Sequence, residues 1–146
     1  VLAAGATLIY PNQNKLIIDA GTCITYDFVN AENQYSGGAI SPGIKIRYKS
    51  LNNYTSKLPL LTLSEDFEII GNSTKSAIHS GVINGVIFEI EGFISQYSLK
   101  NQDLTIILTG GDAEFLAKRL KSTIFANSNF LLESLNLLSL YTQKND

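Results

Sequence analysis

The stretch Leu16-Ile17-Ile18-Asp19-Ala20-Gly21-Thr22-Cys23-Ile24-Thr25-Tyr26-Asp27 places an acidic, glycine-containing turn between two runs of β-prone residues. Its apolar start predicts a buried strand, and the β-branched and aromatic residues after Gly21 predict a second strand. The turn brings a carboxylate, backbone N–H groups and a threonine hydroxyl to one place, and glycine lets an oxyanion approach the backbone closely. This pattern indicates phosphate and cation chemistry; the alternative is a plain Asp/Gly turn at a strand end.

Outward from this turn, the pattern predicts a meander of strands between two helices. The strands are expected at residues 15–19, 22–29 and 34–40. A helix over residues 2–10 precedes them and ends at Pro11, because proline cannot continue a helix. Ser41-Pro42 predicts the start of a helix over residues 42–51, since serine caps a helix and proline fits its first turn. Residues 52–66 lack a sustained period, so a surface loop or flap is expected there.

A long amphipathic helix dominates the second half of the chain. Apolar residues recur near every fourth position, at Ile78, Val82, Val86, Ile90, Ile94 and Tyr97. Asn72 or Ser73 is expected to cap this helix. Its glycines, Gly81, Gly85 and Gly92, cost about 1 kcal/mol each relative to alanine, so we expect a ligand, helix or sheet to pack closely against them.

The C-terminal part is predicted to alternate strands and helices. The expected elements are a strand over 104–108, a tight turn at Gly110-Gly111, a helix over 113–122 capped by Asp112, a short strand over 130–132 and a final helix over 135–141. The whole order fits an α/β fold, with a mixed sheet and packed helices. It matches one ribonuclease-H-like half of the acetate-and-sugar-kinase, Hsp70 and actin (ASKHA) fold, as a single domain over residues 1–146.

Composition excludes several classes of function. The 146 residues carry a net charge of −2, which gives no basic field for nucleic acid or an anionic membrane surface. The single cysteine, Cys23, cannot form an internal disulfide and is interpreted as a packing residue; the single histidine, His79, is expected to pack on the long helix. No uninterrupted apolar run approaches the ~20 residues of a membrane span, so a cytoplasmic location is expected.

Four motifs in order resemble type III pantothenate kinases. They are residues 16–27, Gly37-Gly38-Ala39-Ile40-Ser41-Pro42-Gly43-Ile44, residues 71–82 with the sequence Gly-Asn-Ser-Thr-Lys-Ser-Ala-Ile-His-Ser-Gly-Val, and Ile107-Leu108-Thr109-Gly110-Gly111-Asp112. The resemblance covers only the C-terminal half of a family member. The family's Asp-x-Gly-Asn-Thr turn and its Gly-x-Asp-Arg motif would precede Val1. Because the chain also contains no methionine and begins without a signal-peptide pattern, we expect it to be part of a longer protein.

The resemblance implies roles for individual residues. Asp19 would ligate a monovalent cation, K⁺ or NH₄⁺, and Thr22 would contact ATP, which is used with Mg²⁺. Thr74 would contact pantothenate, with plain helix capping as its alternative. Gly110 and Gly111 would let adenosine lie against the backbone or would form only a turn. Asp27 is expected to be a supporting or surface carboxylate.

The family reaction is the phosphorylation of pantothenate by ATP to 4′-phosphopantothenate, the first step of coenzyme A synthesis. Its proton acceptor would belong to the Gly-x-Asp-Arg motif, so no catalytic base is expected in residues 1–146, and these residues alone are expected to be inactive. A homodimer formed through the long helix is implied. The alternatives are a non-catalytic nucleotide-binding or regulatory remnant of an actin- or Hsp70-like fold, and a sugar or acetate kinase.

Overall fold

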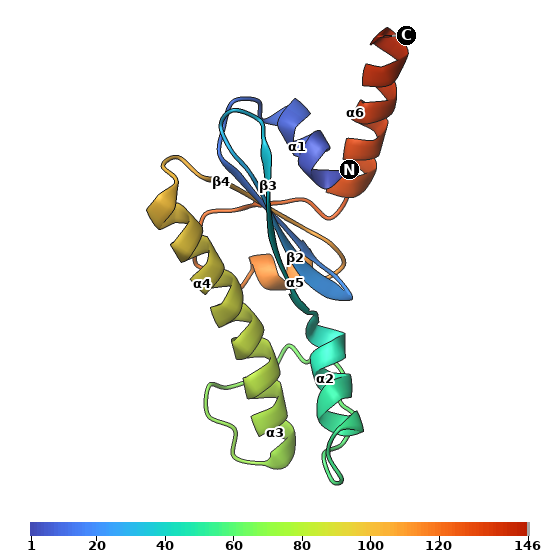
Figure 1. The fold of residues 1–146 in the computed structure, drawn as a ribbon. Helices are drawn as coiled ribbons and strands as arrows, with labels where there is room; N and C mark the ends of the chain where they lie inside the picture. Colours follow the sequence, from blue (N-terminus) through green and yellow to red (C-terminus); the bar gives the residue numbers. More distant parts are fainter. Residues whose placement is uncertain (146) are drawn as a thin grey trace.

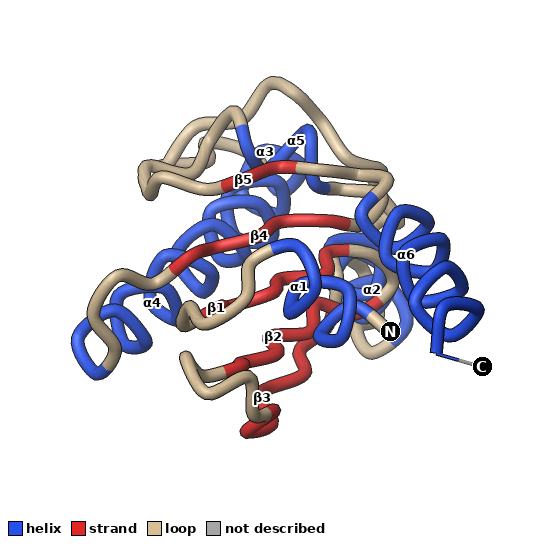
Figure 2. Tube along the Cα trace, turned by 90° about the horizontal axis from the view of Figure 1, so that it is seen from above, coloured by secondary structure: helices blue, strands red, loops and turns tan. Residues whose placement is uncertain are grey.

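The turn at Gly21 joins two strands of a mixed sheet, as shown by a computed structural model that describes residues 1–145. Strands β1 (Lys15–Ala20), β2 (Cys23–Val29) and β3 (Tyr35–Pro42) form an antiparallel meander. Strand β4 (Thr105–Thr109) pairs parallel to β1, and the short β5 (Phe125–Ala126) pairs parallel to β4. The strand order is therefore β3-β2-β1-β4-β5 (Figure 2), which puts β1 at the centre of the sheet.

Alternation along β1 divides the apolar core between the two faces of the sheet, because successive side chains of a strand point to opposite faces. Leu16 and Ile18 lie in the larger core, together with buried residues of α2 (Ile44–Asn53), α4 (Gly85–Lys100) and α5 (Ala113–Ala117). Ile17 lies in the smaller core with residues of α1 (Leu2–Ile9) and α6 (Phe130–Asn145). Figure 1 shows α1 and α6 together at one end of the molecule and α2 with α3 (Thr74–His79) at the other.

The predicted long helix is confirmed, with an irregular turn inside it. The helical segment Thr74–Lys100 consists of α3, a π-helical turn over Ser80–Asn84 and α4. Its length and composition would suit a membrane span, yet residues such as Val86 and Ile90 lie fully buried in the core of this protein. A core helix meets the same criterion of length and composition. Ser73 caps α3 as predicted, in a reciprocal pair of hydrogen bonds with Ser76.

Several sequence-based expectations were wrong. Ser41 and Pro42 end strand β3 and do not start a helix, because they pair with Ile24 and Cys23 of β2; Gly43 is the residue that precedes α2. The expected strand over 130–132 is the first turn of α6, and the helix after Asp112 ends at Ala117. Asp112 precedes that helix, but its side chain makes no capping hydrogen bond.

Two packing expectations also need correction. Cys23 is exposed at the start of β2, because its side chain points away from the face where Ile24 is buried. The added Cβ of an alanine at Gly81 or Gly92 would meet nothing within 4 Å, and at Gly85 it would meet only the Nη1 atom of Arg47, at 3.8 Å. No element of residues 1–145 therefore packs closely against these glycines. His79 is buried as expected, with its Nδ1 atom 2.7 Å from the hydroxyl of Tyr48.

Candidate functional site

Asp19 lies near the carboxyl end of β1, beside the end of the parallel strand β4. It pairs with Thr109 of β4 on one side and with Thr25 of β2 on the other. Burial raises the pKa of the Asp19 carboxyl, and the negative charge of Asp27 raises it further. Within residues 1–145 this carboxylate accepts no hydrogen bond. It lies where open α/β sheets bind their ligands, outside the carboxyl ends of parallel strands.

Gly110 lets the turn after β4 pass directly over the end of β1. Its φ is +98°, and an added Cβ would lie 2.4 Å from the carbonyl oxygen of Ala20 and 2.5 Å from Oδ1 of Asp19. Asp112, two residues later, is held in place as well, because its backbone N–H donates to the same Ala20 carbonyl at 3.0 Å. Only glycine fits here, so the pair Gly110-Gly111 forms a tight turn against Asp19, as the sequence predicts.

Asp112 is a second carboxylate at these strand ends. Burial raises its pKa, and the positive charge of Lys45 partly offsets that rise. Removing carboxylates from water without a compensating partner costs free energy. Asp19 together with the nearby backbone carbonyl of Ala20 supplies oxygen ligands of the kind that K⁺-like hard cations take, so these residues fit a bound monovalent cation.

Thr22 lies exposed in the β1–β2 turn, next to the start of α2. Its carbonyl accepts a hydrogen bond from the N–H of Gly43 at 3.0 Å, and an added Cβ at Gly43 would lie 2.1 Å from the carbonyl oxygen of Gly21. Helix α2 has no side-chain cap at this end, so its positive end faces the turn without a partner from residues 1–145. The Thr22 hydroxyl and this helix end are therefore both open to an anion.

Thr74 lies apart from this turn, at the first position of α3. Ser73 is the cap, and Thr74 makes no capping bond, so the capping alternative for Thr74 was wrong. Its exposed side chain lines a groove of about 590 Å³ between α2 and the helical segment 74–82. Ser50, which also lines the groove, lies seven positions after Gly43 along α2; at 1.5 Å per residue this is roughly 10 Å.

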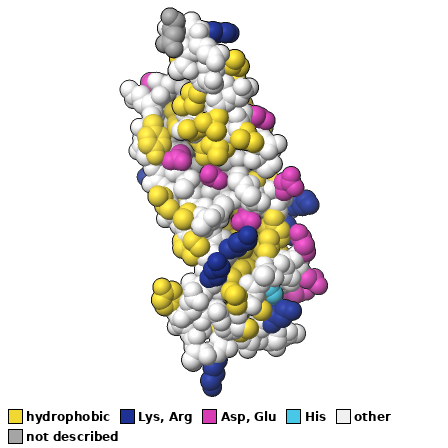
Figure 3. Space-filling model, turned by 90° about the vertical axis from the view of Figure 1, so that its right-hand side faces the viewer, with side chains coloured by type: hydrophobic (Ala, Val, Ile, Leu, Met, Phe, Trp, Pro, Cys, Tyr) yellow, Lys and Arg dark blue, Asp and Glu magenta, His cyan; other side chains and the backbone are white. Residues whose placement is uncertain are grey.

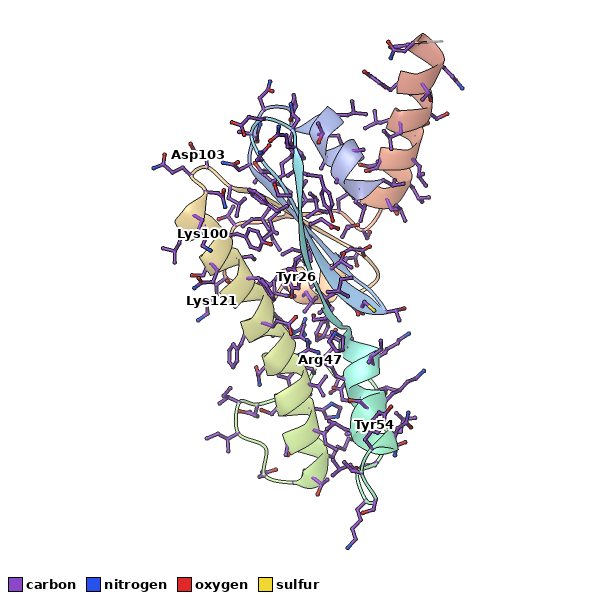
Figure 4. The ribbon with its side chains drawn as sticks, viewed as in Figure 1. Tyr26, Arg47, Tyr54, Lys100, Asp103 and Lys121 are labelled. Atoms are coloured by element: carbon purple, nitrogen blue, oxygen red, sulfur yellow. The ribbon has the colours of Figure 1, made fainter. Side chains whose placement is uncertain are left out.

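A polar cluster that the sequence did not predict lies between these two places. Glu89 accepts hydrogen bonds from the hydroxyl of Tyr26 (2.8 Å), from Oγ of Ser41 and from Nη2 of Arg47 (2.5 Å). These donors hold the pKa of the Glu89 carboxyl below its ordinary value although burial opposes the shift. Figure 4 shows Tyr26 on the sheet and Arg47 on α2, both beside α4. The donors are 63, 48 and 42 residues from Glu89, so no local pattern could reveal the cluster.

The structure thus brings Asp19, Gly110 and Asp112 together, with Thr22 in the adjoining turn, and it leaves Thr74 at the far end of α2. Asp27 lies on β2 opposite Ile17, which is two residues before Asp19 on β1. It accepts a hydrogen bond from the hydroxyl of Tyr35 at 2.8 Å. Its negative charge acts on Asp19 by raising the pKa of that carboxyl, which disfavours the ionised form.

Comparison with known proteins shows the family of this chain. The family model for type III pantothenate kinase matches residues 1–96. The chain is 63% identical over 146 residues to a type III pantothenate kinase of Flavobacterium johnsoniae and 42% identical over 132 residues to one of Bacteroides fragilis. The two alignments include 100% and 90% of this chain but only 60% and 54% of the relatives. The chain therefore spans little more than half of the relatives' length.

Solved structures agree on the fold. A Baf family transcriptional activator from Campylobacter jejuni superposes with a TM-score of 0.68 at 22% identity, covering 97% of this chain and 63% of the other. The ethanolamine utilization protein EutJ from Carboxydothermus hydrogenoformans gives 0.51 at 19% identity, covering 90% and 50%. At these identities the likeness shows the fold alone, and that fold is the α/β, ASKHA-type half expected from the sequence.

Proposed function

Because this chain belongs to the type III pantothenate kinase family, we propose that it supplies the cation, nucleotide and substrate contacts of an enzyme that phosphorylates pantothenate. The reaction is transfer of the γ-phosphate of ATP to the terminal hydroxyl of pantothenate, giving 4′-phosphopantothenate for coenzyme A synthesis. The observation that carries the proposal is the position of Asp19, half-buried and without a hydrogen-bond donor from residues 1–145, against the Gly110 turn.

Each contact has a chemical reason. Asp19 holds a monovalent cation, which offsets the negative charge of the ATP phosphates. Thr22 and the positive end of α2 receive a phosphate group of ATP, used with Mg²⁺, because hydroxyl and backbone N–H donors suit phosphate oxygens. Thr74 binds pantothenate through its hydroxyl, which capping does not occupy. Phosphoryl transfer then depends on positioning and charge neutralisation more than on covalent chemistry by the protein.

We assign the proton acceptor for the pantothenate hydroxyl to a Gly-x-Asp-Arg motif ahead of residues 1–146. In this proposal residues 1–146 form one domain of the enzyme, and a segment ahead of them completes the active site. A cytoplasmic homodimer formed through the long helix completes the proposal. The exposed Phe88 and Leu99 on that helix support an interface there.

The proposal is tested with the full-length protein, by measuring ADP release with ATP and one acceptor at a time. Pantothenate is expected to be the acceptor, with a product that mass spectrometry identifies as the 4′-phosphate. Acetate and hexoses are the matched controls, because they are acceptors of other kinases with this fold. Release of ADP with a sugar or acetate would identify a sugar or acetate kinase instead. Nucleotide binding without transfer to any acceptor would favour a non-catalytic nucleotide-binding protein.

A further inference from the structure

The junction between β3 and α2 is a single residue long. Strand β3 ends at Pro42 and helix α2 begins at Ile44, so Gly43 alone connects them. The backbone N–H of Gly43 donates to the Thr22 carbonyl at 3.0 Å, and the Gly43 carbonyl accepts from the backbone N–H of Arg47 at 3.1 Å. The direction in which α2 leaves the sheet therefore determines where its first backbone N–H groups point.

Glu89 of α4 holds this junction from both sides. Its Oε1 atom accepts a hydrogen bond from the hydroxyl of Ser41, on the strand side, and its Oε2 atom accepts one from Nη2 of Arg47, on the helix side, at 2.5 Å. Nε of the same Arg47 donates back to the carbonyl oxygen of Pro42 at 2.9 Å. These contacts form a closed ring around Gly43, which fixes the end of β3 relative to the first turn of α2.

Glu89 is itself held by the centre of the fold. The hydroxyl of Tyr26, on β2, donates to Oε1 of Glu89 at 2.8 Å, and the Tyr26 ring stacks on Phe93 of α4 with the ring centroids 4.1 Å apart. The side chains of Arg47 and Glu89 are only 21% and 24% exposed, so water screens their attraction less than it does on an open surface. Glu89 is therefore a fixed point to which the β3–α2 junction is attached.

We propose that Glu89 is a positioning residue for ATP, which acts by orienting the N-terminal end of α2 toward the β1–β2 turn. The proposal rests on the proposed function, in which that helix end and the Thr22 hydroxyl receive a phosphate group. Glu89 does not touch the nucleotide in this arrangement; it fixes the first-turn N–H groups that do. A donor that is fixed before the ligand arrives binds it without a further loss of conformational freedom.

The test uses two substitutions in the full-length protein. Glu89→Gln leaves one acceptor oxygen, which can serve Ser41 or Arg47 but not both, because these donors bind different oxygens of the carboxylate. Ser41→Ala removes the strand-side contact and leaves the ion pair in place. Both variants should raise the KM for ATP, on the order of 10-fold for Glu89→Gln, the lower end of the range for outer partners that orient metal ligands. The KM for pantothenate should stay unchanged in Ser41→Ala, because Arg47, which lines the groove beside Thr74, keeps its contacts.

Glu91 is the matched control, because it lies on the same helix and also uses both of its carboxylate oxygens. It accepts hydrogen bonds from the backbone N–H groups of Lys121 and Ser122 and from the Ser122 hydroxyl, in the loop between α5 and β5. Glu91→Gln should lower the melting temperature without changing the KM for ATP. An equal rise of that KM in Glu91→Gln, or no rise in Glu89→Gln, would show that Glu89 is purely structural and would overturn the proposal.

A second measurement does not depend on the reaction. Hydrogen exchange of the Gly43 and Arg47 amides, followed by NMR, should be faster in Glu89→Gln than in wild type, because both amides are hydrogen-bonded at the junction. Glu91→Gln should leave their exchange unchanged. Equal exchange in Glu89→Gln and wild type would overturn the positioning role. Absence of pantothenate turnover in the wild type would instead refute the proposed function, while the exchange result still decides whether Glu89 holds the junction.

Discussion

At the scale of single residues, the molecule places ionisable groups where they cost stability. Lys15 is fully buried, and its Nζ donates to the carbonyls of Tyr10 and Gln13 at 2.9 and 2.8 Å, so burial lowers its pKa but the hydrogen bonds compensate for it. Asp19 has no such compensation from residues 1–145. The contrast separates a structural charge, which caps the end of α1, from a carboxylate that the described residues leave without a hydrogen-bond donor.

The first prediction concerns Asp19. Its folded-state pKa is raised above 3.8, so the proton is held more tightly in the folded state, and the stability from this group is lost as the pH rises through the raised pKa. Asp19→Asn removes this loss, and the variant should be at least as stable as wild type at pH 7 without K⁺. Adding K⁺ should raise the melting temperature of the wild type and not that of Asp19→Asn, as measured by thermal shift in Na⁺- and K⁺-containing buffers of equal ionic strength.

A K⁺-dependent increase of equal size in both proteins would place the cation elsewhere. In the full-length protein the same substitution should blunt the response of turnover to K⁺. The matched control is Asp27→Asn, which removes the neighbouring charge but leaves the Asp19 carboxylate in place.

The second prediction separates Thr74 from its neighbour. Thr74→Ala should raise the pantothenate KM by the equivalent of about 0.5–1.5 kcal/mol, the range for one neutral hydrogen bond, with an unchanged melting temperature. Ser73→Ala should do the reverse and cost about 1 kcal/mol of stability, because Ser73 is the N-cap. Thr74→Ser keeps the hydroxyl and should retain binding. A stability loss for Thr74→Ala with an unchanged pantothenate KM would make Thr74 structural.

At the scale of elements, local sequence patterns predicted the strands and helices that local periodicity determines. They failed where pairing with a strand distant in the sequence determines the structure. The meander and the long helix followed from alternation and from the four-residue period. Ser41-Pro42 carries a helix-start signal, but pairing with β2 extends the edge strand to Pro42, where a missing N–H costs nothing. The prediction of a strand over residues 130–132 is wrong, because a short apolar run does not distinguish a strand from a helix.

The same distinction applies to the site. The Asp19 turn and the Gly110 turn were predictable, since each is one local motif at a strand end. The cluster around Glu89 was not, because it joins β2, β3, α2 and α4, and its members carry no common local signal.

The third prediction belongs to the contact between the β1–β2 turn and α2. Gly43→Ala puts a Cβ 2.1 Å from the Gly21 carbonyl oxygen and 2.4 Å from that of Thr22. Such overpacking against backbone should cost about 1–3 kcal/mol. Urea unfolding measures the change. Gly92→Ala is the control, because its Cβ meets nothing within 4 Å and alanine favours the helix by up to about 1 kcal/mol. Equal stability of Gly43→Ala and wild type would show that the turn does not abut α2.

At the scale of the whole molecule, one end carries an apolar surface. Figure 3 shows hydrophobic side chains gathered in the upper part of the face that it draws. Exposed apolar residues of α1 and α6 and of the N-terminus include Val1, Leu8, Leu131, Leu132, Leu135, Leu140 and Tyr141. Apolar patches of this kind are typical of interfaces. The chain also spans only 60% of the Flavobacterium johnsoniae relative.

The fourth prediction follows from this partial coverage of the relatives. Residues 1–146 alone should show no pantothenate-dependent ADP release above a tag-only control, because the proposed proton acceptor lies outside them. Supplying the preceding segment should restore turnover. The measurement is a coupled ADP assay on both proteins, with circular dichroism to confirm that the shorter one is folded. Turnover by the 146 residues alone would place the proton acceptor within them.

The central position of β1 has a consequence for the order in which the protein is made. Its antiparallel partner β2 follows at once, but its parallel partner β4 ends at Thr109, about 90 residues after Ala20. At roughly 5–20 residues per second, a ribosome needs about 5–18 seconds to synthesise that interval. During this time the meander can form, but the edge of β1 that later pairs with β4 has no partner, and the apolar residues Leu16 and Ile18 lie beside that unpaired edge. The nascent chain is therefore most exposed to wrong strand pairing just before the sequence Thr105–Thr109 leaves the ribosome.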